Sequence, residues 1–166
     1  KIEGLPTFKE EQGWLVLPES VEFKWSTTRN IEKKWFDLGL KHLIKTAAPM
    51  RSAADCTEAL INGYPLTQAS NFGFRRTDVR GTPPVRMVTW DGSWSHQTYI
   101  DEYWDHPTEG EIYRWGNNWG PSVHGAPTGD EPPGGVYISK KTLDSICRNG
   151  EVYAFSAFDG FPAREL

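Results

Sequence analysis

Residues 92–120 carry two side chains that could act together as a general base and its orienting group. The stretch reads GSWSHQTYIDEYWDHPTEGEIYRWGNNWG, with His96 early in one predicted strand and Asn117 at the end of the next. Side chains on neighbouring strands of a sheet can face each other directly. An amide oxygen on one ring nitrogen would hold the imidazole in a single tautomer, as a general base requires. Because an amide carries no formal charge, the pair suits proton exchange with a cysteine thiol.

Trp119 and Gly120 follow the asparagine and extend this motif. The indole of Trp119 could cover the predicted hydrogen bond between His96 and Asn117 and keep water from competing for it. Gly120 allows a tight turn beneath the indole. The residue types alone, however, favour a purely structural interpretation, in which a strand histidine and an Asn-Asn turn only close a hairpin.

A second group of titratable residues lies nearby in the sequence. Asp101, Glu102, Asp105 and His106 could bind a metal ion or provide the carboxylate pair of a hydrolase. Asp101 and Glu102 would point to opposite faces of a strand, so we expect a solvent-exposed strand edge instead. His124 lies in a loop rich in Gly and Pro, from which it could reach a site, but its expected place is the surface.

The aromatic residues suggest a third kind of site, a stacking platform for sugars. They are Trp90, Trp94, Trp104, Trp115, Trp119, Tyr99, Tyr103 and Tyr113. At strand spacing such side chains are more often part of the core. The run FRRTDVRG could hold a phosphate or a carboxylate, but we expect its three arginines to be solvated.

The chain has two cysteines, Cys56 and Cys147, and neither lies in a metal-binding spacing. Cys56 falls on the apolar face of a predicted helix, which favours a buried small hydrophobic residue over a reactive thiol. Cys147 is expected to belong to the scaffold. At most one disulfide can form, and a reducing compartment is mildly favoured.

Composition limits the remaining function classes. A chain of 166 residues with 13% aromatic residues is long enough for one domain with a full core. The net charge of -4 and the lack of a basic stripe argue against nucleic-acid binding. No apolar run has the length of a membrane span, so we expect a soluble protein. The chain begins at Lys1 rather than Met, which suggests a processed product or a fragment.

Apolar periodicity and turn residues predict the elements that must position these side chains. The best-marked helix begins at Ser52, which forms an S-x-x-D capping box with Asp55, and ends at Gly63. Other helices are predicted over residues 30–40 and 139–148, strands over 43–46, 64–70, 85–90, 96–103, 111–115, 135–139 and 151–158, and loops over 71–84 and 121–135. This order favours an α+β fold with a mainly antiparallel sheet.

Three segments together resemble the C-terminal half of a papain-like cysteine peptidase. They are GSWSHQTYIDEYW, EIYRWGNNWGPSVHG and GGVYIS, preceded by DCTEALINGYPLTQAS, and the likeness covers about residues 52–139. It implies a papain-like α+β domain over residues 26–166, with a half-barrel sheet and two or three flanking helices, after a weakly structured segment of residues 1–25. It also implies that His96 is the catalytic histidine, Asn117 its orienting asparagine and Trp119 the shielding tryptophan, with no metal or cofactor.

The chain departs from the family at the nucleophile. Papain-like peptidases place their cysteine about 130–150 residues before the histidine, whereas Cys56 lies much closer and on an ordinary helix. No glutamine precedes a Cys-Trp pair, which is the family's oxyanion and nucleophile signature. Three explanations stay open. The nucleophile lies on an upstream segment or another chain, the domain is an inactive structural or interaction module, or Cys56 is recruited in a rearranged layout.

The resemblance therefore predicts a cysteine-peptidase-type domain that acts on a polypeptide through a cysteine supplied from elsewhere. The first alternative is a catalytically inactive papain-fold module, for instance a component of a phage virion, and the second is a carbohydrate-binding sheet domain. The expected partner is a polypeptide substrate or another protein, such as the rest of a cleaved precursor or a virion assembly. The expected location is a virion or the bacterial cytoplasm.

Overall fold

The structure is a computed structural model that describes residues 33–34, 37, 40, 44 and 46–155. Its contacts divide the chain into two units, and the larger unit, which begins at Thr46, carries the sheet and the helices described below. The predicted segment 1–25 lies outside the described residues. The helix over 30–40 and the strand over 43–46 lie largely outside them.

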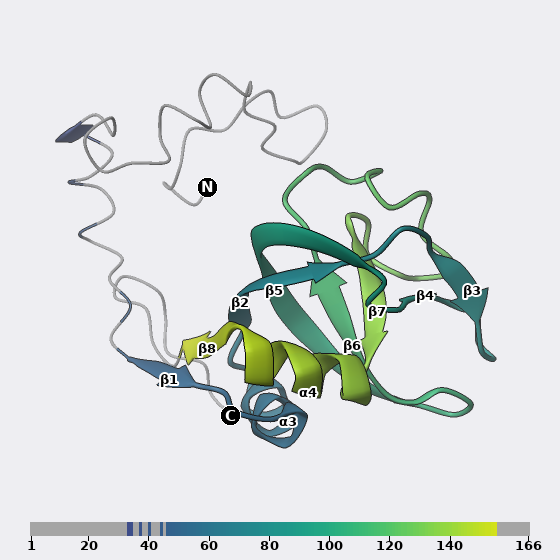
Figure 1. The fold of residues 1–166 in the computed structure, drawn as a ribbon, viewed down its shortest axis with the longest axis horizontal. Helices are drawn as coiled ribbons and strands as arrows, with labels where there is room; N and C mark the ends of the chain where they lie inside the picture. Colours follow the sequence, from purple (N-terminus) through teal and green to yellow (C-terminus); the bar gives the residue numbers. More distant parts are fainter. Residues whose placement is uncertain (1–32, 35–36, 38–39, 41–43, 45, 156–166) are drawn as a thin grey trace. The chain divides into compact units, whose positions relative to one another are not determined.

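An eight-stranded sheet dominates the described unit, in the order β1-β8-β2-β5-β6-β7-β4-β3 (Figure 1). The strands are β1 (Ala47–Pro49), β2 (Leu66–Gly73), β3 (Asp78–Arg80), β4 (Val85–Val88), β5 (Gly92–His106), β6 (Gly110–Gly116), β7 (Gly135–Ser139) and β8 (Glu151–Phe155). Neighbouring strands pair antiparallel except β4 and β7, which are parallel. The predicted α+β fold with a mainly antiparallel sheet is confirmed.

Two helices complete the described unit, α3 (Ala53–Ile61) and α4 (Lys140–Asn149). The capping box is formed as predicted, because Ser52 accepts a hydrogen bond from the Asp55 backbone while the Asp55 carboxylate accepts one from the Ser52 backbone. Ser139 caps α4 through the backbone N–H of Thr142. In the described part of the chain, no helix is long and apolar enough to cross a membrane.

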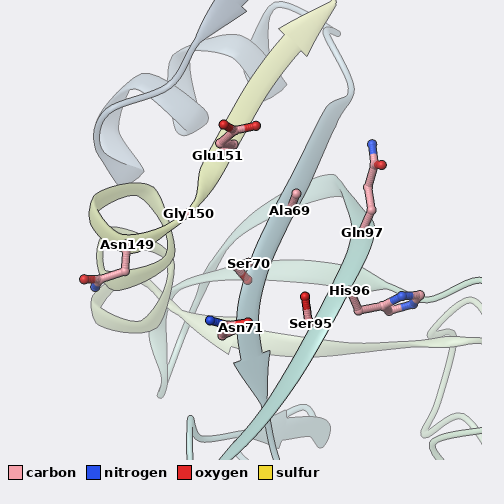
Figure 2. A pocket seen from close by; sticks show the side chains of 9 residues that line it. All are labelled: Ala69, Ser70, Asn71, Ser95, His96, Gln97, Asn149, Gly150 and Glu151. Atoms are coloured by element: carbon pink, nitrogen blue, oxygen red, sulfur yellow. The ribbon is translucent and has the colours of Figure 1, made fainter.

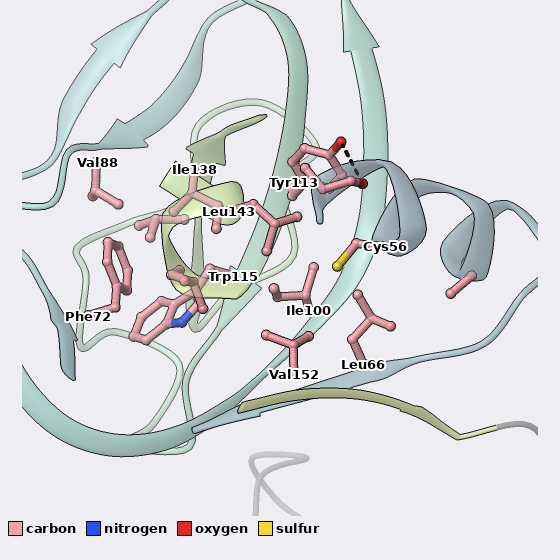
Figure 3. Close-up of a cluster of buried hydrophobic side chains, with 14 of the residues drawn as sticks. Cys56, Leu66, Phe72, Val88, Ile100, Tyr113, Trp115, Ile138, Leu143 and Val152 are labelled. Carbon is pink, nitrogen blue, oxygen red and sulfur yellow. Dashed lines mark hydrogen bonds between the residues drawn. The ribbon is translucent and has the colours of Figure 1, made fainter. Parts of the chain in front are cut away.

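One hydrophobic core joins both helices to the sheet (Figure 3). Cys56 from α3, Leu143 from α4 and Trp115 from β6 all belong to it and are almost fully buried. Burying each large apolar side chain stabilises the fold by about 1.5–3 kcal/mol. Thr57 and the Tyr113 hydroxyl share a 2.6 Å hydrogen bond that also ties α3 to β6.

Two edge strands differ from the prediction. Residues 71–84 were expected to form a loop, but residues 71–73 extend β2 and residues 78–80 form β3. Among the described strands, β3 pairs with β4 alone, and an edge strand needs no apolar alternation. β1 lies just after the predicted strand 43–46 and includes Pro49; an edge position accommodates a residue that cannot donate a backbone hydrogen bond.

Candidate active site

The hairpin of β5 and β6 brings His96 and Asn117 together. β6 ends at Gly116, which lies opposite Tyr99 of β5, and Asn117 follows directly. The His96 Nε2 atom lies 3.0 Å from the Asn117 Oδ1 atom. A side chain at Gly116 would clash with the Tyr99 ring, so a glycine here lets that ring lie across β6 beside the asparagine. The two residues chosen from the sequence are therefore in contact.

A neighbouring backbone group decides the direction of this hydrogen bond. The Asn118 N–H donates to Asn117 Oδ1 at 2.7 Å, which identifies that atom as the amide oxygen. Because an amide oxygen only accepts, Nε2 of His96 must carry the hydrogen. Nδ1 then holds the lone pair, and it has no hydrogen-bond partner among the described residues. The ring is thus prepared to accept a proton at Nδ1.

Trp119 lies against the face of the His96 ring. The two ring centroids are 4.5 Å apart with an interplanar angle of 24°, and the Trp94 ring lies 5.6 Å from the Trp119 ring. Trp119 remains 49% exposed. The indole therefore limits how the imidazole can tilt. Its role as a shield of the hydrogen bond to Asn117 stays a prediction.

His124 occupies a different place from the one expected. It is partly buried rather than on the surface, and its Nε2 atom lies 3.1 Å from Asn117 Nδ2. The rings of Phe74 and Trp115 pack on it, with centroids 5.0 and 5.5 Å away. Burial, followed by the positive charge of Arg86, lowers the pKa of His124 to about 4. The imidazole is therefore uncharged at neutral pH.

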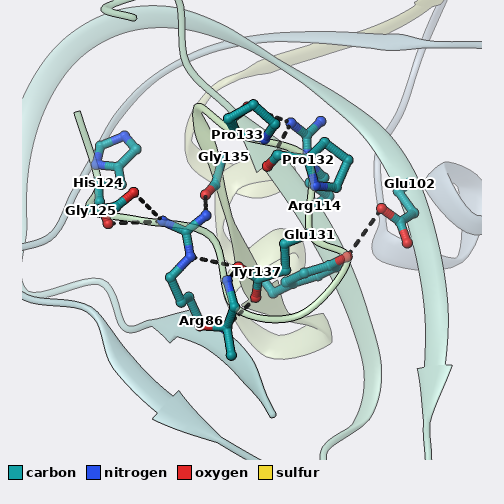
Figure 4. Close-up of polar contacts among 11 residues, drawn as sticks. Arg86, Glu102, Arg114, His124, Gly125, Glu131, Pro132, Pro133, Gly135 and Tyr137 are labelled. Carbon is teal, nitrogen blue, oxygen red and sulfur yellow. Dashed lines mark hydrogen bonds and ion pairs between the residues drawn. The ribbon is translucent and has the colours of Figure 1, made fainter. Parts of the chain in front are cut away.

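Arg86 and Glu131 hold the loop that carries His124, and the sequence interpretation did not single out either residue. Their ion pair of 2.5 Å is almost fully buried, with side chains 4% and 6% exposed. The Arg86 guanidinium also donates to the carbonyls of His124 and Gly125, each at 2.9 Å, and of Gly135 at 2.7 Å (Figure 4). The Arg86 side chain thus holds the loop at residues 124–125 and again at residue 135.

The acidic cluster is used for structural contacts. Asp101 forms an ion pair with Arg114 at 2.5 Å. Glu102 accepts a 3.1 Å hydrogen bond from the Tyr137 hydroxyl (Figure 4). His106 was expected on an exposed edge but is buried, with Nε2 2.8 Å from the Pro83 carbonyl. Within the described residues, no three His, Cys, Asp or Glu side chains gather into a set that could hold a metal ion.

The two thiols lie beside each other, between α3 and α4. Cys56 is completely buried in the core, as predicted (Figure 3). Its Sγ atom is 3.7 Å from that of Cys147. The hydrogen bond between them, then burial, raises the pKa of the Cys56 thiol, while the same hydrogen bond lowers the pKa of Cys147. In the described part of the chain, no hydrogen bond joins either thiol to His96.

An open pocket of about 380 Å³ lies next to the histidine. His96 and Ser95 on β5 form one side, and Asn149, Gly150 and Glu151 form the other, across β2 (Figure 2). Comparison of the whole chain with models of protein families, with curated proteins and with solved structures finds no match.

Proposed function

We propose that this domain supplies the general base and its orienting group to a papain-like cysteine peptidase site. The observation that carries the proposal is the hydrogen bond between His96 and Asn117, with its direction fixed by the Asn118 N–H. An imidazole with Nε2–H on an amide oxygen and Nδ1 unbonded is the state that a cysteine nucleophile requires. An open pocket that His96 lines has room for part of a polypeptide substrate.

The reaction follows from this arrangement. Nδ1 of His96 takes the proton of a cysteine thiol, and the Asn117 oxygen stabilises the resulting imidazolium through Nε2–H. The thiolate attacks the carbonyl carbon of a peptide bond. His96 then returns the proton to the leaving amine, so that an acyl-enzyme remains. A water molecule, deprotonated by the same nitrogen, hydrolyses the thioester and regenerates the thiol.

The nucleophile in this proposal is a cysteine other than the two that the chain contains. Both of these cysteines lie in the described part of the chain. Cys56 is buried with a raised pKa, and its position in the core keeps substrate away from it. Cys147 shares its hydrogen bond with Cys56 rather than with His96. A further segment of a longer protein or a partner chain would therefore bring the thiol to Nδ1.

A thiol-directed peptidase probe tests the proposal on the chain purified together with its natural precursor or partner. Covalent labelling is expected on a cysteine other than Cys56 or Cys147. It should be lost in His96→Ala and should fall in Asn117→Ala. Asp105→Ala is the matched control, because this exposed residue lies at the other end of the same strand, outside the pocket, and should leave labelling unchanged. Labelling at Cys56 or Cys147, or labelling that survives His96→Ala, would contradict the proposal.

A non-catalytic interaction module is the second candidate, and one observation favours it. Two large apolar side chains in the segment that follows Asn117 are exposed, Trp119 at 49% and Val123 at 38%. Exposed apolar groups of this kind are typical of contact surfaces between proteins. Absence of probe labelling, together with binding of a partner that Trp119→Ala weakens, would favour this function.

A further inference from the structure

We infer that His124 is a positioning residue, whose unprotonated Nε2 fixes the orientation of the Asn117 amide and through it the tautomer of His96. The inference deepens the proposed function and rests on it for its catalytic meaning. The hydrogen bonds of Asn117 with His96 and His124 are present in this chain whether or not another segment supplies a nucleophile. The inference rests on the hydrogen bonds of the Asn117 side-chain amide with His96 Nε2, the Asn118 N–H and His124 Nε2.

The two ends of the Asn117 amide have different partners. Oδ1 accepts from His96 Nε2 at 3.0 Å and from the Asn118 N–H at 2.7 Å, and Nδ2 lies 3.1 Å from His124 Nε2. Because Nδ2 carries only hydrogens, His124 Nε2 must accept, and the hydrogen of its neutral ring must be on Nδ1. If the amide were turned over, its Nδ2 hydrogens would face the N–H groups of His96 and Asn118. Its Oδ1 lone pair would face the lone pair of His124 Nε2.

The loss of any one partner weakens this discrimination. With His124 as acceptor, all three contacts favour a single amide orientation. Without it, Asn118 and His96 remain, but His96 can change tautomer and adapt to a reversed amide by accepting at Nε2. A reversed amide would therefore place the hydrogen on Nδ1 of His96 and remove the basic lone pair. Together with the Asn118 N–H, the acceptor on His124 therefore adds one more contact that holds the oxygen toward His96.

The surroundings of His124 keep it in the accepting form. The rings packed on it, from Phe74, from Trp94 on β5 and from Trp115 on β6, carry no charge. The charged groups facing it are Arg86 on β4 and its partner Glu131. The guanidinium donates to the His124 carbonyl and so fixes the backbone under the ring. Protonation of a partly buried imidazole beside this guanidinium is disfavoured.

Nitrogen NMR on histidine-labelled protein tests the inference without requiring activity. In the wild type, His96 should show a protonated Nε2 and a free Nδ1, and His124 the reverse. His124→Leu replaces the acceptor with an apolar side chain, whereas His124→Gln supplies an uncharged amide oxygen as acceptor in place of the ring nitrogen. The buried His106 is an internal reference, since its own hydrogen bonds are unaffected by either variant. Thermal unfolding confirms that both variants are folded.

The expected result is a drop of about fivefold in the ratio of the two His96 tautomers in His124→Leu, which corresponds to one hydrogen bond. His124→Gln should restore the wild-type ratio. An unchanged ratio in His124→Leu, an equal change in both variants, or a protonated Nε2 on wild-type His124 would each overturn the inference. If the tautomers respond as expected and probe labelling fails, the positioning role stands and the peptidase proposal falls.

Discussion

Acidification should destabilise this domain through His124. The pKa of this imidazole is about 4 in the folded chain, against 6.5 for an ordinary histidine. Between these two values the unfolded chain binds a proton that the folded chain does not, so the free energy of unfolding falls as the pH falls. The stabilisation is fully present above about pH 6.5 and is lost as the pH decreases toward about 4.

The magnitude follows from the separation of the two pKa values. One pKa unit corresponds to 1.36 kcal/mol, so the full effect is about 3 kcal/mol. Solvent reaches part of the His124 ring, which reduces the expected loss to about 2–3 kcal/mol. The physical cost combines removal of the imidazolium from water, repulsion by Arg86 and the loss of the hydrogen bond from Asn117.

Urea unfolding at a series of pH values, followed by tryptophan fluorescence, measures this effect for the wild type and for His124→Gln. All other titratable groups are the same in both proteins, so the difference between the two profiles isolates His124. The difference should be constant near pH 7 and should change by about 2–3 kcal/mol on the way to about pH 4. Parallel profiles over this range would refute the assigned protonation state.

Two further changes follow from the same structure. Arg86→Met leaves Glu131 buried without its partner and should lower the free energy of unfolding by about 3–5 kcal/mol. Lys140→Met removes the solvent-exposed ion pair with Glu111 and should lower the free energy of unfolding much less. Equal losses in urea unfolding would contradict the role given to the buried pair. An aromatic disulfide reagent should titrate Cys147 in the folded domain and reach Cys56 only after unfolding, and a Cys147→Ala variant that still reacts at the native rate would show that the buried thiol is accessible.

The sequence could predict those parts of the fold that have a local signal. Ser52 and Asp55 form a capping box within one turn, and His96 and Asn117 belong to one hairpin, so their approach needs only the correct pairing of adjacent strands. His124 and Arg86 have no such signal. Their contact joins β4 to a long loop, and only the parallel pairing of β4 with β7 brings the two segments together. A lone arginine in a short strand gives no periodicity by which its buried partner could be recognised.

The contacts of Arg86 also divide the long loop into two parts with different freedom to change. The guanidinium holds residues 124–125 on one side and residues 131 and 135 on the other. Most of the side chains between these anchors, in residues 126–130, are exposed. Substitutions in residues 126–130 should therefore leave the positions of His124 and Asn117 unchanged. The loop can therefore acquire new surface contacts, and with them new binding partners, while His96 and His124 stay in place.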